Sequence, residues 1–340
     1  MRQHSKWQLL LLLIAVVCPM TAQAQQRMRL ATVAPKASSF HNILVVMGTE
    51  WKAQDVELKI YPGGARGGEA DIVSLMRNGA LEAGLLTAVG LSEIDPSVHA
   101  LQSVPMLFRS LDEVDYVGEK LRPRLEKKLR ERGFVVLFWA DAGWVRFFSK
   151  SPIATPADLR KAKLFTWAGD VSTVDLYRKS GFHPVALETN DILPSLQTGM
   201  INAVPLPPYI ALTTQVFVHA PYMLQLDWAP LVGALVVTEK SWNRLTPSQQ
   251  RELARAAGAA GKVMKQRNRL ESERSVISME QRGLKVTRIG PAVTSEWRAT
   301  VEQKYSQFRG GRIPADLFDE VITLLAQYRS QAQPKAAAAR

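Results

Sequence analysis

Short apolar segments of strand length alternate with segments of helical periodicity through the first half of the chain. Strand patterns at residues 29–34, 56–61 and 81–87 are separated by helical patterns at residues 38–54 and 69–78. Connections of helix length join parallel strands, because a short turn can join only antiparallel neighbours. The sequence therefore predicts an α/β fold built on a largely parallel sheet.

The rest of the chain continues this alternation, with strand patterns at residues 134–139 and 235–238, and adds one long helix. Thr246 has the side chain of an N-cap, and Pro247 fits the first helical position. The helical pattern then continues to about Gly283. A chain of 340 residues is long enough for two domains that each bury a core, and the composition shifts at residues 149–152.

The N-terminus has the pattern of a secretory signal peptide. A basic start at residues 2–6 precedes an apolar run over residues 9–17 that is too short to span a bilayer. Ala22 and Ala24 are small residues at cleavage spacing, so we predict cleavage after Ala24 and a periplasmic protein. Lipoprotein cleavage before Cys18 and an uncleaved anchor are the alternatives. Loss of the single cysteine would leave a mature chain without disulfides or thiol chemistry.

Sequence patterns of catalysis and metal binding are missing. The four histidines that remain after cleavage are scattered without an HExxH pattern, and no GxSxG elbow occurs. The glycine-rich stretch at residues 63–68 lacks the GK[ST] ending of a phosphate-binding loop. We therefore expect no enzyme activity, no metal site and no cofactor.

The chain is basic, with a formal net charge of +12 and clusters of Lys and Arg at residues 120–132 and 251–282. Nucleic acid is the usual partner of such clusters. No nucleic-acid motif is present, however, and export would separate the chain from that partner. We predict solvated helix faces and no nucleic-acid binding. Contact with an anionic membrane surface is the alternative.

Several short motifs follow one another in a specific order between Leu30 and Phe308. They are YPGGARGGE from Tyr61, GALEAG from Gly79, VPMLF from Val104, PIATPADLRKAKL from Pro152, LQTG from Leu196 and WNRLTPSQ from Trp242. Each motif alone is weak, but their order and spacing resemble the extracytoplasmic solute receptors of TRAP transporters, the DctP-like family.

This resemblance implies a fold of the periplasmic-binding-protein type (type II-like, a flytrap) in which two α/β domains close on a solute. Crossing strands near residues 147–148 and 235–236 and a long connecting helix would join the domains. Accordingly, we place domain I at 27–148 with about 236–258, domain II at 149–235 with about 259–308, a C-terminal helix at 309–330 and a disordered tail at 331–340.

The resemblance also implies a function and partners. A family member is a periplasmic receptor that delivers a small-molecule solute to TRAP membrane subunits, as a monomer or a homodimer. The same fold could instead serve a periplasmic carrier or sensor that passes a hydrophobic, lipid-like ligand between other membrane components. Adjacent genes for TRAP membrane subunits would favour the first role.

The sequence departs from the family pattern where the family binds a carboxylate. Phe165 stands at the position of the family arginine, and a second arginine position falls on either Arg146 or its neighbour Val145. A guanidinium binds a carboxylate through two parallel hydrogen bonds, which phenylalanine cannot make. Val33 and Leu206 are also apolar at positions that are often polar in the family. These residues predict a ligand that is more apolar or aromatic than the usual carboxylates.

The predicted ligand site combines an apolar lining with a few polar groups. The apolar and aromatic candidates are Val33, Trp144, Phe165, Trp167, Leu206, Tyr209 and Trp228, and the polar candidates are Glu69, Thr87, Arg146 and Asp191. Aromatic residues at strand spacing are often core residues, and Asp191 could be only an N-cap. An ordinary organic-acid receptor that uses Arg146 is the alternative to an apolar ligand.

Overall fold

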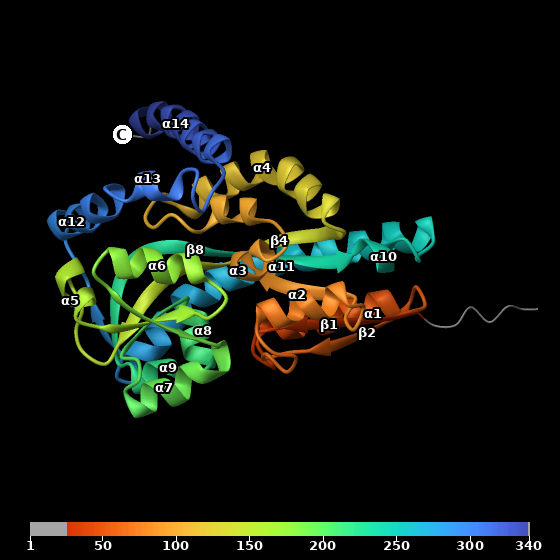
Figure 1. Ribbon diagram of the computed structural model, residues 1–340, viewed down its shortest axis with the longest axis horizontal. Coiled ribbons are helices and arrows are strands. Elements are labelled where there is room, and N and C mark those ends of the chain that lie inside the picture. Colours follow the sequence, from red (N-terminus) through yellow and green to blue (C-terminus); the bar gives the residue numbers. More distant parts are fainter. Residues whose placement is uncertain (1–25, 339–340) are drawn as a thin grey trace, which may run out of the picture.

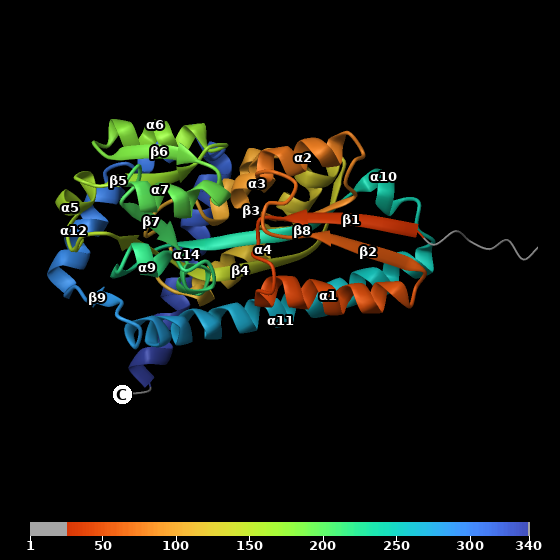
Figure 2. The ribbon, with the colours of Figure 1, turned by 90° about the horizontal axis from the view of Figure 1, so that it is seen from below.

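The computed structural model describes residues 26–338, so the predicted signal peptide lies outside the described residues. The chain forms one nine-stranded sheet in the order β2-β1-β3-β8-β4-β7-β5-β6, and β9 pairs with β8. Figure 2 shows helices on both sides of this sheet. The predicted α/β class is confirmed, because β1 pairs in parallel with β2 and β3, and β5 pairs in parallel with β6 and β7.

Two groups of parallel strands lie at the two ends of the sheet, and we call them the first and second lobes (Figure 1). The first lobe contains β1 (Gln26–Thr32), α1 (Ser39–Lys52), β2 (Val56–Tyr61), α2 (Glu69–Arg77), β3 (Ala83–Thr87), α3 (Ala88–Ser92) and the 3-10 helix η1 (Pro96–Leu101). The second contains α5 (Pro156–Arg160), β5 (Lys163–Trp167), α6 (Val171–Lys179), β6 (His183–Leu187), η2 (Thr189–Asp191), α7 (Ile192–Thr198), β7 (Ala203–Leu206), α8 (Pro208–Thr213) and α9 (Val216–His219).

Two long antiparallel strands join the lobes. They are β4 (Phe134–Ser149) and β8 (Tyr222–Thr238), with 16 and 17 residues. The strand patterns at residues 134–139 and 235–238 and the predicted crossings near 147–148 and 235–236 fall on these two strands, but the patterns are much shorter than the strands. Gly143 and Pro230 obscure the strand pattern, yet β4 and β8 continue through register shifts, one of them between Asp141 and Trp144.

The remaining elements follow β8 in the chain. They are α10 (Glu239–Trp242), α11 (Pro247–Glu280), β9 (Lys285–Thr287), α12 (Pro291–Glu302), α13 (Tyr305–Phe308) and α14 (Ala315–Ala338), while α4 (Leu111–Glu131) precedes β4. Helix α11 is the predicted long helix and runs below both lobes in Figure 2. Its N-cap is Thr246, whose hydroxyl accepts from the backbone N–H of Gln249 at 3.2 Å, as the sequence predicts.

The C-terminal helix packs against α4 (Figure 1). Arg329 binds Glu113 at 2.8 Å, and Arg124 binds Glu320 at 2.6 Å and also Asp316. Part of the basic face of α4 is therefore neutralised by α14 and is not simply solvated. The predicted tail needs correction as well, because α14 continues to Ala338 instead of ending at residue 330. The predicted domain limits stay a prediction, since one continuous sheet runs through both lobes.

Helix α11 packs closely on β4 through a glycine. A Cβ atom at Gly261 would lie only 2.6 Å from the ring Cγ of Phe138. At Gly258, in the same helix, an added Cβ would meet nothing within 4 Å. The absence of a side chain at residue 261 therefore lets the helix approach the strand that joins the lobes.

We expect Gly261→Ala to lower the free energy of unfolding by roughly 1–3 kcal/mol, because the added methyl group overpacks the contact with Phe138. Gly258→Ala should raise it by up to about 1 kcal/mol, because alanine favours the helix. Urea denaturation of the two variants and the parent protein measures both effects. Equal effects of the two substitutions would contradict the close contact of α11 with β4.

Candidate functional site

A cavity of about 360 Å³ lies between the two lobes. Val33 and Thr87 line it from the first lobe, and Trp167 and Leu206 line it from the second. Each of these residues lies at or just after the carboxyl end of a parallel strand. Open α/β sheets form their ligand sites at such strand ends, and here two of these edges face each other.

Most of the cavity wall is apolar. Its apolar residues include Val33, Ala34, Pro35, Phe40, Leu85, Leu86, Ala140, Ala142, Leu206, Ile210, Leu231, Val232 and Met264. The polar lining residues are Thr32, Lys36, Thr87, Asp141, Thr189, Asn190 and Thr214. Lys36 is exposed and is the only lining residue with a positive charge. The cavity can thus surround an apolar solute surface and place one cation beside it.

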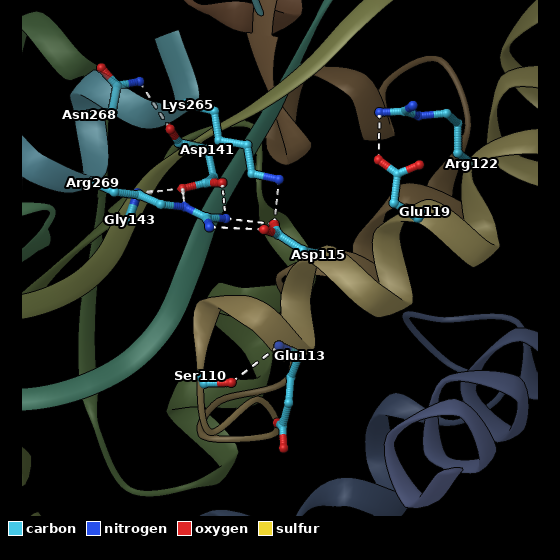
Figure 3. Close-up of polar contacts among 10 residues, drawn as sticks. All are labelled: Ser110, Glu113, Asp115, Glu119, Arg122, Asp141, Gly143, Lys265, Asn268 and Arg269. Atoms are coloured by element: carbon cyan, nitrogen blue, oxygen red, sulfur yellow. Dashed lines mark hydrogen bonds and ion pairs between the residues drawn. The ribbon is translucent and has the colours of Figure 1, made fainter. Parts of the chain in front are cut away.

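The carboxylate of Asp141 lines the cavity but is already neutralised (Figure 3). Arg269 of α11 donates to both of its oxygens, at 3.1 and 2.6 Å, and the N–H of Gly143 donates at 3.1 Å. Arg269 also binds Asp115 of α4, which pairs with Lys265 at 2.5 Å. This network fixes β4 to α11 beside the cavity. The negative charge of Asp141 is already paired with Arg269 and is not available to a cationic ligand.

Glu69 does not line the cavity, but it positions Thr87, which does. The buried carboxylate accepts hydrogen bonds from the N–H of Thr87 at 2.6 Å, from its hydroxyl at 2.5 Å and from the N–H of Gly90 at 3.0 Å. Burial raises the pKa of Glu69, although these hydrogen bonds oppose the shift. The structure therefore gives Glu69 a supporting contact with a lining residue.

Arg146 does not line the cavity, and its charge is paired elsewhere, although its Nη1 has no hydrogen-bond partner among the described residues. It binds Asp227 of β8 at 3.2 Å and Glu273 of α11 at 2.9 Å, and it is almost completely buried. A solute carboxylate would have to compete with two carboxylates already in place. The alternative prediction, an organic-acid receptor that uses Arg146, requires this guanidinium to face the cavity, and here it does not line the cavity.

The other predicted site residues do not line this cavity. Phe165 is fully buried and packs edge-on against Trp167 at 5.0 Å. Trp144 and Trp228 are also buried in hydrophobic clusters. Asp191 is exposed at the start of α7 and makes no capping hydrogen bond.

Tyr209 makes a contact between the lobes instead of lining the cavity. Its hydroxyl oxygen accepts a hydrogen bond from the N–H of Ser39 in α1 at 2.6 Å. Its ring lies 6.0 Å from that of Phe40. Phe40 does line the cavity, so Tyr209 supports a wall residue from the opposite lobe.

Lys36, Asp141 and Asn190 line the cavity but were not predicted. Lys36 and Asn190 follow the ends of β1 and β6, so the rule that ligands bind at the carboxyl ends of parallel strands could have found them. Asp141 could not be found in this way, because it lies in the middle of β4, which the sequence predicted too short.

A buried polar cluster lies near the second lobe. Arg312, just before α14, binds both oxygens of Asp170 at 2.5 and 2.6 Å. His99 of η1 is buried nearby and shares a hydrogen bond of 2.8 Å with the hydroxyl of Ser103. Burial, with a contribution from the charge of Arg312, lowers the pKa of His99 to about 4, while Asp170 opposes this shift.

Residues 30–310 match the family described as bacterial extracellular solute-binding protein, family 7 (DctP). The chain belongs to this family. It is 23% identical to the 2,3-diketo-L-gulonate-binding periplasmic protein YiaO of Escherichia coli K12, over 68% of this chain and 71% of that protein.

Two solved structures of TRAP periplasmic solute-binding proteins have the same fold. One, from Xanthobacter autotrophicus Py2 with bound β-D-galacturonate, has a TM-score of 0.80 and 20% identity. The other, from Ralstonia eutropha H16 with bound (S)-2-acetolactate, has a TM-score of 0.82 and 20% identity. Each alignment covers 88% of this chain and 99% of the other.

These matches confirm the predicted DctP-like family and the two-domain periplasmic-binding fold. The family model describes extracellular solute-binding proteins, so the predicted general role of a solute-binding protein is confirmed as well. Among residues 26–338, no helix is long and apolar enough to cross a membrane, and no cluster of His, Cys, Asp and Glu could hold a metal ion. Cleavage after Ala24 stays a prediction.

We expect acid to destabilise the protein partly through His99. The folded state keeps its imidazole neutral, whereas in the unfolded chain the pKa is about 6.5. The unfolded state therefore binds more protons between pH 6.5 and pH 4, and the free energy of unfolding falls as the pH decreases through this window. His99→Gln should remove up to roughly 3 kcal/mol of this loss. Urea denaturation at pH 7, 5.5 and 4.5 measures it, and parallel pH profiles of variant and parent would contradict a neutral His99.

Proposed function

We propose that this protein is a TRAP receptor for a small organic acid that carries a substantial apolar surface. The observation that supports the proposal best is the cavity between the lobes, whose lining is largely apolar and includes one exposed cation, Lys36. The relatives named above bind a diketogulonate, a galacturonate and an acetolactate, all of them carboxylates. The volume of about 360 Å³ lies at the lower end of ordinary small-molecule sites.

Lys36 takes the place of the missing arginine in this proposal. It follows β1 on the first lobe and lies in an exposed turn at the cavity. An ion pair with an exposed lysine contributes only about 0–1 kcal/mol in water. Closure of the lobes on a solute would remove water from the pair and strengthen it. The apolar wall would supply the remaining affinity through contact with the carbon skeleton.

A second candidate function is a receptor for an uncharged apolar or aromatic ligand. Phe165 at the family arginine position favours such a ligand. The apolar wall of the cavity favours it, and so does the absence of any arginine among the lining residues. The two candidates differ in one property. An acid receptor needs the charge of Lys36, whereas a receptor for an uncharged solute does not.

Calorimetric titration of the chain from Gln25 onward tests the proposal. The probes are 2,3-diketo-L-gulonate, D-galacturonate and (S)-2-acetolactate, with the methyl esters of the last two as uncharged analogues. We expect at least one acid to bind, its ester to bind at least tenfold more weakly, and Lys36→Gln to weaken the acid about fivefold or more.

The matched control is Lys52→Gln, which removes an exposed lysine at the end of α1, outside the cavity. It should leave the affinity for the acid unchanged. Binding of an ester as tight as that of its acid would overturn the proposal in favour of the uncharged ligand. Native mass spectrometry of the purified protein would then identify the bound molecule. Delivery to TRAP membrane subunits, and a monomeric or dimeric state, stay predictions for this chain.

A further inference from the structure

A second, smaller cavity of about 80 Å³ lies beside the ligand cavity, and Trp167 lines both. We call it the polar chamber. Val89 and Gln102 line it from the first lobe, Thr166 lines it from the second, and Arg312 lines it from the C-terminal segment. We propose that the polar chamber is a subsite for an uncharged oxygen of the solute, a carbonyl or a hydroxyl, held by Arg312 and Thr166. This inference rests on the proposed function.

Two residues that line the chamber each have a buried hydrogen-bonding group without a partner among the described residues. The two groups are the Nε of Arg312 and the hydroxyl of Thr166. The side chain of Arg312 is only 7% exposed, and Thr166 is 3% exposed. Nearly all buried polar groups in folded proteins have a hydrogen-bond partner. Two unpartnered groups on the wall of one cavity therefore point to a partner that comes from outside the chain.

The ion pair of Arg312 fixes its guanidinium and sets the charge of the chamber. Its two terminal nitrogens bind the two oxygens of Asp170, at 2.5 and 2.6 Å, and one of them also donates to the hydroxyl of Ser172. Nε is the guanidinium nitrogen without a partner among the described residues. Asp170 itself accepts from the N–H of Thr173 at 3.1 Å and from its hydroxyl at 2.7 Å. The pair has no net charge, so the chamber favours a neutral oxygen over a second carboxylate. The carboxylate of the acid would remain with Lys36.

The chamber lies where the family resemblance expects arginines. Phe165, at the expected arginine position, and Val145, one of the two candidates for the second position, both line it. Arg312 enters the same space from beyond residues 30–310, the part of the chain that matches the family. A guanidinium from the C-terminal segment thus supplies a donor beside two strand positions that have apolar side chains. The chamber volume suffices for one small polar group, since a water molecule needs about 10–15 Å³ on the same measure.

Groups from both lobes enclose the chamber, so an oxygen bound there would favour the closed arrangement. Gln102 holds its first-lobe side in place, because its side-chain oxygen accepts from the N–H of Val232 in β8 at 2.8 Å. On the second lobe, Asp170 caps α6 through Thr173. The polar chamber would in this way couple recognition of the solute to closure.

A matched pair of acids tests the subsite by calorimetry. (S)-2-Acetolactate carries a ketone that 2-hydroxy-2-methylbutanoate lacks, while the carbon skeleton and the carboxylate are the same. We expect the parent protein to prefer acetolactate by about tenfold or more, because one charge-assisted hydrogen bond is lost with the ketone. Thr166→Val and Arg312→Lys should each reduce this preference at least about threefold. D-Galacturonate, which carries hydroxyls, should bind more weakly to both variants.

Thr166→Val keeps the shape of the side chain and removes a hydroxyl without a partner, so its Tm should equal or exceed that of the parent protein. It therefore tests the subsite even if Arg312→Lys unfolds the protein. Arg309→Lys is the matched control, since Arg309 pairs with Asp319 at the surface of the same segment and lies outside the chamber.

The outcomes separate the two proposals. If the parent protein binds an acid but Thr166→Val binds every acid as the parent does, with the same preference, the subsite is wrong and the proposed function stands. If the parent protein binds none of the acids, the proposed function fails and the subsite fails with it. A reduced preference in Thr166→Val with an unchanged Tm supports both.

Discussion

The antiparallel pairing of β4 with β8 is the constraint on which the rest of the structure depends. These two strands pair with the first lobe through β3 and with the second lobe through β7. They join two groups of parallel strands into one sheet in such a way that the carboxyl ends of both groups point toward the middle. Backbone N–H and C=O groups at those ends have no further strand residues to bind. The cavity between the lobes follows from this arrangement, because two sets of strand ends and their loops meet there. The register shift between Asp141 and Trp144 lies beside the cavity, where the joining strands depart from regular pairing.

The local elements could be predicted from the sequence, and the joining strands could not. Caps and periodicity are local signals, so the limits of α11 and β2 were predicted within a few residues. The middle of β4 and β8 contains Gly143 and Pro230, which locally favour a break, and only the long-range pairing keeps these segments extended. The candidate site divides in the same way. Residues at strand ends, such as Val33 and Trp167, were predicted to line the cavity and do so. Arg312 was not predicted, because nothing local shows that a segment before α14 returns to the second lobe.

Desolvation explains how the protein distributes its positive charge around the cavity. A buried guanidinium without a carboxylate would cost several kcal/mol, and accordingly Arg146, Arg269 and Arg312 are all paired with acidic side chains. Those pairs leave the buried surroundings of the solute nearly neutral. Lys36 escapes this constraint because it is exposed in the open turn after β1. Its charge becomes fully effective only when a solute and the opposite lobe exclude water. Selectivity for an acid would then depend on closure and not on a preformed arginine clamp.

The contact between the lobes at the rim of the cavity supports this dependence on closure. Gly64 and Gly68 of the first lobe face Asn190 and Glu188 of the second. An added Cβ would lie 2.9 Å from the side-chain nitrogen of Asn190 and 2.2 Å from a carboxylate oxygen of Glu188. The glycines therefore let two polar side chains pack directly on the backbone of the opposite lobe. Because these side chains are polar, separation of the rim returns hydrated groups to water and exposes little apolar surface. Separation of this contact exposes little apolar surface, so the closed form depends more on the contact of Tyr209 with Phe40 and on what occupies the space behind the rim. A solute that fills the apolar cavity and satisfies the unpartnered groups would shift the equilibrium by the difference of its contacts in the two forms.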